Sequence, residues 1–207
     1  DPAPGADDDA SGMAGVLAIA ESLAAAAAGG PPRRTLRFVL FNAEEHGLVG
    51  SKAYVRDQAA VGAPIVAAFQ MDMIGFNAKD PRAFEVHAGY WPLPEVQERS
   101  RVLAERVARL TPQVSSTLPP PQLYLSRGPS GADRDPAERR SDHASFQERG
   151  YAACAVSEDF FAGPDPSAPA PEPNPNYHRD GDTFVDFEYA ADIARAVGAA
   201  AWVTASM

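Results

Sequence analysis

The sequence has little cysteine, little positive charge and no long hydrophobic run. Cys154 is the only cysteine among 207 residues, so no internal disulfide can form, and its apolar surroundings predict an inert core side chain. The formal net charge of -10 argues against a nucleic-acid surface, which needs a basic stripe. No apolar stretch approaches the ~20 residues that cross a bilayer, so we expect no membrane span. We assign the alanines at 24–28 to an amphipathic helix rather than to a secretion signal.

Helical and strand-like segments alternate along the chain, whose length suits a single domain over residues 1–207. This alternation predicts an α/β fold, a three-layer α/β/α sandwich with a mixed, mainly parallel central sheet. The predicted strands are 35–42, 65–72, 84–88, 122–125 and 152–157, with 84–88 near an edge because its polar and apolar residues alternate. The predicted helices are 12–28, 48–59, 94–110, 142–149 and 187–206.

Helix ends and faces follow from local patterns. Ser11 and Ser141 are the expected N-caps of the helices at 12–28 and 142–149. The apolar spacing assigns an inward face to each of two helices, with Met13, Val16, Leu17, Ala20 and Leu23 on the first and Val96, Leu103, Val107 and Leu110 on the helix at 94–110. Two long Pro- and Gly-bearing loops, 117–140 and 163–175, are interpreted as walls of a substrate cleft, with plain surface loops as the alternative.

Four short acidic or imidazole-bearing segments stand beside these elements. They are Gly5 to Gly12, Ala43 to Gly47, Gln70 to Met73 and Asn176 to Thr183. Carboxylates gathered where strands end are costly to bury unless a cation neutralises them. Carboxylates with an imidazole suit zinc and similar divalent metals, so the set predicts a metal-dependent hydrolase site. Each segment alone is explained as well by a helix cap, a solvated strand end or a surface histidine.

As a set, these segments resemble the zinc aminopeptidases of family M28, which share a co-catalytic two-metal site. The resemblance runs from Pro4 to about Thr183. It implies that Asp8 bridges two Zn²⁺ ions, that Glu45 and His178 complete one metal's ligands, and that Asp72 binds the other metal. Glu44 would be the general base, taking a proton from water and passing it to the leaving amine. The resemblance also implies a cis peptide bond between Asp8 and Asp9.

Two features depart from the family pattern. The family places a further histidine ligand in a His-x-Asp motif before the Asp8 turn, so we expect that the chain is truncated at its N-terminus and that its second metal site is weakened. The family also places an oxyanion-stabilising tyrosine three residues before the segment Ser141-Asp142-His143, where this chain has Glu138. Tyr124 and His143 remain as alternatives for that role, as does its absence.

Several neighbouring residues are candidates for supporting roles. Asp182 either orients His178 or begins a turn, and Asp142 is a second candidate for orienting the site. Met73, Phe160, Phe161 and Phe184 either line an apolar substrate pocket or belong to the core.

The sequence therefore predicts a peptide-hydrolysing zinc aminopeptidase with Glu44 as base. Two alternatives stay open, a single-zinc acyltransferase similar to glutaminyl cyclases and an inactive interaction domain of the same fold. The resemblance suggests a secreted or periplasmic location.

Overall fold

A four-stranded mixed sheet organises the chain in a computed structural model that describes residues 3–78, 80–161 and 172–207. The strands lie in the order β1 (Ala68–Met71), β4 (Ala153–Glu158), β2 (Phe84–His87) and β3 (Gln122–Tyr124). β1 and β4 are parallel, as are β2 and β3, while β2 and β4 are antiparallel. The mixed, mainly parallel sheet predicted from the sequence is therefore confirmed.

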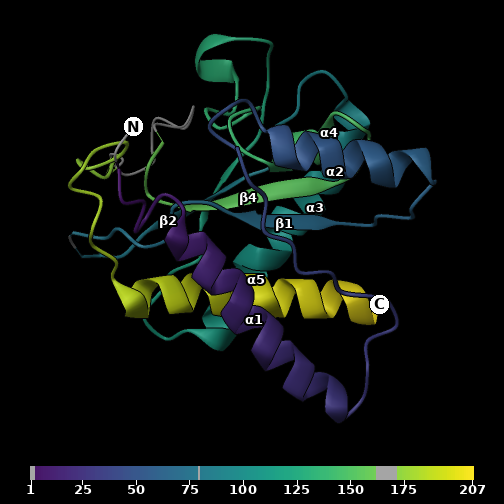
Figure 1. Cartoon of the computed structure of the whole chain (residues 1–207), viewed down its shortest axis with the longest axis horizontal. Helices are drawn as coiled ribbons and strands as arrows, with labels where there is room; N and C mark the ends of the chain where they lie inside the picture. Colours follow the sequence, from purple (N-terminus) through teal and green to yellow (C-terminus); the bar gives the residue numbers. More distant parts are fainter. Residues whose placement is uncertain (1–2, 79, 162–171) are drawn as a thin grey trace.

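Helices cover both faces of this sheet (Figure 1). On one side lie α2 (Val49–Ala60) and α4 (His143–Gln147), which pack on each other. On the other side α5 (Phe187–Ser206) contacts both α1 (Ala10–Ala28) and α3 (Pro94–Val114). A short 3₁₀ helix, Gly131–Asp133, interrupts the long loop after β3. The layers are those of an α/β/α sandwich.

Each face of the sheet has its own apolar core. The larger core joins α3 and α5 to β2 and β4, and it includes Val107, Ile193 and Val156, all fully buried. The smaller core centres on Val55 of α2 and Phe146 of α4. Burying a side chain of this size contributes ~1.5–3 kcal/mol, so these contacts hold the helices to the sheet. The predicted inward face of α3 is confirmed for Val96, Leu103 and Val107, with Leu110 partly buried.

Two strand predictions are wrong. Residues 35–42 form no strand in the described part of the chain, because β1 pairs only with β4 and the segment attaches through side chains instead. Arg37 donates to Gln58 of α2 over 2.5 Å, and the Phe41 ring packs on Tyr54 at 5.5 Å. β2 is an interior strand, not an edge strand.

The polar residues of β2 misled the prediction because they are buried together. Glu85 and His87 are fully buried, and the His87 Nε2 lies 3.0 Å from the Glu85 carboxylate. A buried ion pair satisfies polar groups inside a sheet, so alternation of polar and apolar residues does not require an edge.

The predicted cap of α1 is wrong, and its predicted inward face is confirmed only in part, for Val16 and Leu23, which pack against the larger core. Asp9 is the N-cap, and its Oδ1 accepts from the Gly12 N–H at 3.1 Å, while Ser11 donates to the Asp7 carbonyl at 2.7 Å. Met13 and Leu17 are 42% and 61% exposed, because α1 turns its glycines toward the sheet. A Cβ on Gly12 would lie 2.7 Å from the Met71 carbonyl oxygen, so this close approach requires glycine.

Among the described residues, α1 is the one helix that is long and apolar enough to cross a bilayer. We had expected no segment of such length and composition. In the structure α1 packs against α5 and β1. Its buried residues are Ser11, Gly12, Gly15 and Ile19.

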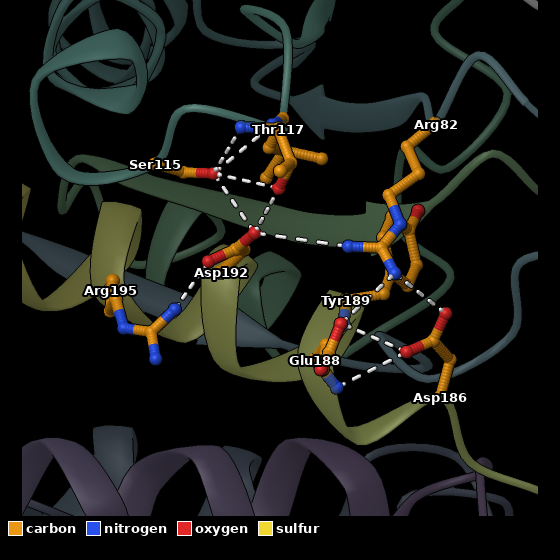
Figure 2. Close-up of polar contacts among 9 residues, drawn as sticks. Arg82, Ser115, Thr117, Asp186, Glu188, Tyr189, Asp192 and Arg195 are labelled. Carbon is orange, nitrogen blue, oxygen red and sulfur yellow. Dashed lines mark hydrogen bonds and ion pairs between the residues drawn. The ribbon is translucent and has the colours of Figure 1, made fainter.

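A polar network fixes the start of α5 (Figure 2). Asp186 caps this helix by accepting from the Tyr189 N–H at 3.0 Å, and its own N–H donates to the Gly75 carbonyl at 2.7 Å. Arg82 lies between two helix carboxylates, 3.1 Å from Asp186 and 3.9 Å from Asp192. The network joins α5 to the loop that follows β1, and so fixes the end of the segment that precedes α5.

We predict that Arg82→Met lowers the free energy of unfolding by ~2 kcal/mol, because the partly buried Asp186 loses its cation and Asp192 keeps only Arg195. For a chain of this size that is a fall of about 4–8 °C in the thermal midpoint. Arg56→Met is the matched control, because Arg56 pairs with Asp57 in solvent and the midpoint should not move. Equal effects of the two variants in thermal denaturation would contradict the proposed role of Arg82.

Candidate metal centre

Four loops bring the predicted site residues to one end of β1. Asp8 lies in the turn before α1, Glu44 and Glu45 lie in the loop before α2, and Asp72 directly follows β1. His178 lies in a turn that precedes α5. In α/β sheets, ligands bind outside the carboxyl ends of the strands, which is where these loops meet.

Three side chains converge there. The His178 Nε2 lies 2.6 Å from the Glu45 Oε1 and 3.2 Å from the Asp8 Oδ2. One ligand atom from each of Asp8, Glu45 and His178 lies within 4.8 Å of the other two. Two carboxylate oxygens and an imidazole nitrogen form a donor set that zinc accepts. The structure thus brings together three of the four predicted ligands.

Asp72, the fourth, lies near this group but outside it. Its carboxylate accepts a hydrogen bond from the Ser141 hydroxyl, which itself accepts from the Gln70 amide at 2.8 Å. The Ser141 hydroxyl therefore bonds to Asp72. The prediction that Ser141 caps α4 is wrong. The negative charge of Asp72 nevertheless acts on the neighbouring carboxylates, because it raises the pKa of Asp8 and of Glu44.

The electrostatics of the site are those of carboxylates without enough positive charge. Burial, followed by the charges of Asp72 and Glu45, raises the pKa of Asp8 to about 7, although His178 opposes the shift. Burial and the charge of Asp72, with Asp142 next, raise the pKa of Glu44 to about 8. Like charges disfavour each other's ionisation, and a divalent cation would remove the penalty. The donor set and the crowding of acids both fit a metal.

Asp182 holds the backbone of the Asp8 turn. Its buried carboxylate accepts from the Asp7 N–H at 3.0 Å and from the Asp8 N–H at 3.1 Å. The Asp182 carboxylate therefore orients the Asp8 turn, not the His178 ring as one of the two interpretations had it. The peptide bond between Asp8 and Asp9 is cis, as the resemblance implied.

The two oxyanion candidates lie near His87 of β2. Tyr124 stacks on the His87 ring at 5.0 Å and donates its hydroxyl to Gln122 at 2.5 Å. His143 is fully buried, and burial lowers its pKa to about 4, with Asp135 and His87 as the charges that act on it. The stacking on His87 and the bond to Gln122 engage the Tyr124 side chain, whereas neither ring nitrogen of His143 has a hydrogen-bond partner in the described part of the chain.

His87 itself is an ion-paired core residue. Burial opposes its charge, but Asp135 at 2.7 Å and Glu85 at 3.0 Å outweigh burial and raise the pKa of His87 to about 9. Glu138, at the position where the family has tyrosine, is also buried and accepts from Arg134 at 3.1 Å.

The remaining predicted residues differ in how they relate to the site. Met73 is buried, and its N–H donates to the Asp9 carboxylate at 3.2 Å, so it contacts the residue that follows Asp8. Phe184 is 53% exposed and pairs with Phe76 at 6.5 Å. Asp142 is nearly buried and hydrogen-bonds to Ser51, and its charge is one of those that raise the pKa of Glu44.

Aromatic rings extend away from His178. Tyr177 packs on the His178 ring at 3.8 Å and on Phe160 at 4.9 Å, and Phe160 meets Phe161 at 4.9 Å. Of the two loops expected to wall a cleft, 117–140 contributes Arg140, whose guanidinium lies 5.7 Å from the Phe161 ring. The other, 163–175, lies outside the described residues up to position 171.

Tyr177 lies in the site, although no role was assigned to it from the sequence. Burial and the charges of Asp8 and Glu45 raise its pKa to about 12, which places it in the field of the carboxylate group. The available signal was its position directly before His178, an aromatic side chain adjacent to a predicted ligand.

Comparison with known proteins gives a consistent result. The family model for "Peptidase family M28" matches residues 1–203. The chain is 29% identical over 202 residues to leucine aminopeptidase 1 of Sclerotinia sclerotiorum, covering 93% of this chain and 45% of that protein. It is 28% identical over 226 residues to a probable zinc metalloprotease of Pyricularia oryzae, covering 99% of this chain and 43% of that protein.

A solved aminopeptidase shares the fold. The structure of the aminopeptidase from Aneurinibacillus sp. strain AM-1 superposes with a TM-score of 0.62 at 28% identity, covering 97% of this chain and 40% of that one. The chain thus spans less than half the length of each of these three proteins.

The crowded carboxylates predict how the stability of the metal-free protein depends on pH. A carboxyl group whose pKa is higher in the folded state binds more protons there, so its stabilising contribution is lost as pH rises through the folded pKa. The pKa of Asp8 rises from an ordinary value of 3.8 to about 7, and that of Glu44 rises from 4.5 to about 8. The thermal midpoint measured in chelator should therefore fall between pH 5 and pH 8.

Glu44→Gln should make this fall smaller, because the neutral amide removes one of the titrating groups. Glu148→Gln is the control and should keep the full fall, because Glu148 is exposed and directly follows α4. An unchanged pH profile in the Glu44 variant would contradict the electrostatic account of the site.

Proposed function

Because this chain belongs to peptidase family M28, we propose that it is a zinc-dependent aminopeptidase, which hydrolyses the N-terminal peptide bond of peptides. The observation that carries the proposal is the convergence of Asp8, Glu45 and His178, whose ligand atoms lie within 4.8 Å of one another. The names of the leucine aminopeptidase and zinc metalloprotease relatives support the choice of substrate class and metal.

The roles divide according to the placement of the residues. Asp8, Glu45 and His178 would hold zinc, which when bound polarises a carbonyl and lowers the pKa of a water molecule. Glu44 accepts the proton of the attacking water and delivers it to the leaving amine. Glu45 belongs to the converging ligand group and its neighbour Glu44 does not, so we assign metal binding to Glu45 and proton transfer to Glu44. The raised pKa of Glu44, about 8, shows how strongly the site opposes a further negative charge before the cation is present.

Asp72 is proposed as the ligand of a second, weaker metal. None of the other histidines is among the ligands we assign to it: His87 is paired with Glu85 and Asp135, His143 is fully buried, and His46 is exposed in the loop before α2. We infer that the 207 residues form one peptidase domain.

The aromatic rings beside His178 suggest which substrates fit. Phe160 and Tyr177 present an apolar surface next to the ligand group, with ring centroids 4.9 Å apart. Such a surface favours an apolar side chain at the substrate N-terminus.

Zinc titration by calorimetry tests the metal assignment. We predict one tight equivalent per chain, with any second equivalent at least about tenfold weaker because Asp72 lacks an imidazole partner. His178→Ala should abolish the tight equivalent, whereas Asp72→Asn should retain it. Two equally tight equivalents would contradict the inferred asymmetry, and tight binding that survives His178→Ala would contradict the site itself.

Hydrolysis of leucyl-p-nitroanilide tests the catalytic role of Glu44. Loss of a general base should lower kcat by about 10²–10⁴-fold in Glu44→Gln, with zinc affinity nearly unchanged because Glu44 is not a ligand. Glu21→Gln, an exposed glutamate of α1, should leave both unchanged. A parallel incubation with a glutaminyl peptide separates the reactions, since a cyclised product without amide hydrolysis would favour an acyltransferase.

A further inference from the structure

The turn that carries His178 has an unusual backbone and several internal hydrogen bonds. His178 adopts a positive φ of 58°, which is uncommon for a residue with a side chain. The turn is closed by bonds from the Tyr177 N–H to the Asn174 carbonyl and from the Asp182 N–H to the Arg179 carbonyl, both 3.1 Å. Such a conformation persists only where its surroundings determine it, so the contacts that hold this turn matter for where the imidazole lies.

Asn174 joins this turn to the Asp8 turn through its side chain. Its Nδ2 donates to the Asp7 Oδ2 at 2.9 Å, and its Oδ1 accepts from the Asn176 N–H at 2.9 Å. The Asp7 carboxylate needs a donor, and the Asn176 N–H needs an acceptor. The amide of Asn174 supplies a donor and an acceptor from one side chain. Asn174 is 5% exposed, so water does not readily replace either bond.

Asp7 is a fixed anchor for this contact. It is fully buried, and its Oδ1 accepts from the Gly75 N–H at 2.8 Å, in the loop that follows β1. The fully buried Glu158, at the end of β4, lies beside it and hydrogen-bonds to it. Two carboxyl groups already share this pocket, so the neutral amide of Asn174 brings a donor without adding a third acid.

We propose that Asn174 is a positioning residue that holds the His178 turn against Asp7 and so places the imidazole beside the Asp8 carboxylate. The geometry supports this, because Asp7 is the residue directly before the proposed ligand Asp8 and Asn174 lies four residues before the proposed ligand His178. The inference rests on the proposed metal centre. Partners that orient metal ligands typically change metal affinity by about 10–100-fold when they are removed.

Three variants isolate the amide of Asn174. Asn174→Asp keeps the shape and the acceptor but replaces the donor by a carboxylate facing Asp7. Asn174→Ala removes both bonds without adding charge, and it serves where the first variant does not fold. Asn176→Asp is the matched control, because it makes the same chemical change two residues away while its backbone N–H still donates to Asn174.

Amide hydrogen exchange of the metal-free chain tests the link between the two turns. The reporters are the N–H groups of Asp7 and Asp8, which bond to Asp182 and not to Asn174. We expect their exchange to become at least about fivefold faster in both Asn174 variants and to stay unchanged in Asn176→Asp. Unchanged exchange at these two amides in Asn174→Ala would overturn the proposal.

Cobalt titration, followed by visible absorption, tests the consequence for the metal centre. The Asn174 variants should bind Co²⁺ at least about tenfold more weakly than the unsubstituted chain, and Asn176→Asp should not. Faster exchange with unchanged Co²⁺ affinity would mean that Asn174 only stabilises the turn, and it would overturn the positioning role. An unsubstituted chain that binds no Co²⁺ would contradict the proposed function instead, and the exchange rates alone would then decide whether Asn174 links the turns.

Discussion

Mutual repulsion among carboxylates at the carboxyl end of β1 is the constraint on which the site depends. Burial and then acidic neighbours raise the pKa of Asp8 and of Glu44, and burial raises the pKa of Asp72 although hydrogen bonds from Ser141 and Gln70 oppose the shift. His178 is the imidazole in contact with this group, 3.2 Å from Asp8 and 2.6 Å from Glu45. A fold that gathers acids in this way loses stability unless a cation compensates for their charge. The donor set of Asp8, Glu45 and His178 is one that zinc accepts.

The rest of the structure holds these acids where they would otherwise separate. Asp182 takes the backbone of the Asp8 turn, Ser141 takes the Asp72 carboxylate, and Asn174 ties the His178 turn to Asp7. Each of these contacts joins segments more than sixty residues apart in the sequence. The sheet supplies the common edge, and the network at the start of α5 fixes the end of the segment that carries His178. The proposed metal site therefore depends on contacts from across the whole fold.

The sequence allowed the prediction of elements whose signal is local. The inward face of α3, the mixed sheet and the four loops of the site follow from periodicity, strand composition and acidic motifs. The failures occurred where a distant contact decides the outcome. Residues 35–42 have strand composition but lie without a strand partner among the described residues, and Glu85 and His87 are buried because they pair with each other. The roles of Ser11 and Ser141 depended on Asp7 and Asp72, and the Tyr124 ring stacks on His87. No local pattern encodes such contacts.

The central claim is that Asp8, Glu45 and His178 bind one zinc ion together, and anomalous diffraction from zinc-loaded crystals at the zinc absorption edge tests it most directly. The account predicts a strong peak about 2.0–2.2 Å from an oxygen of each carboxylate and from the His178 Nε2. A zinc peak located elsewhere in the chain, with these three side chains bonded only to one another, would contradict it.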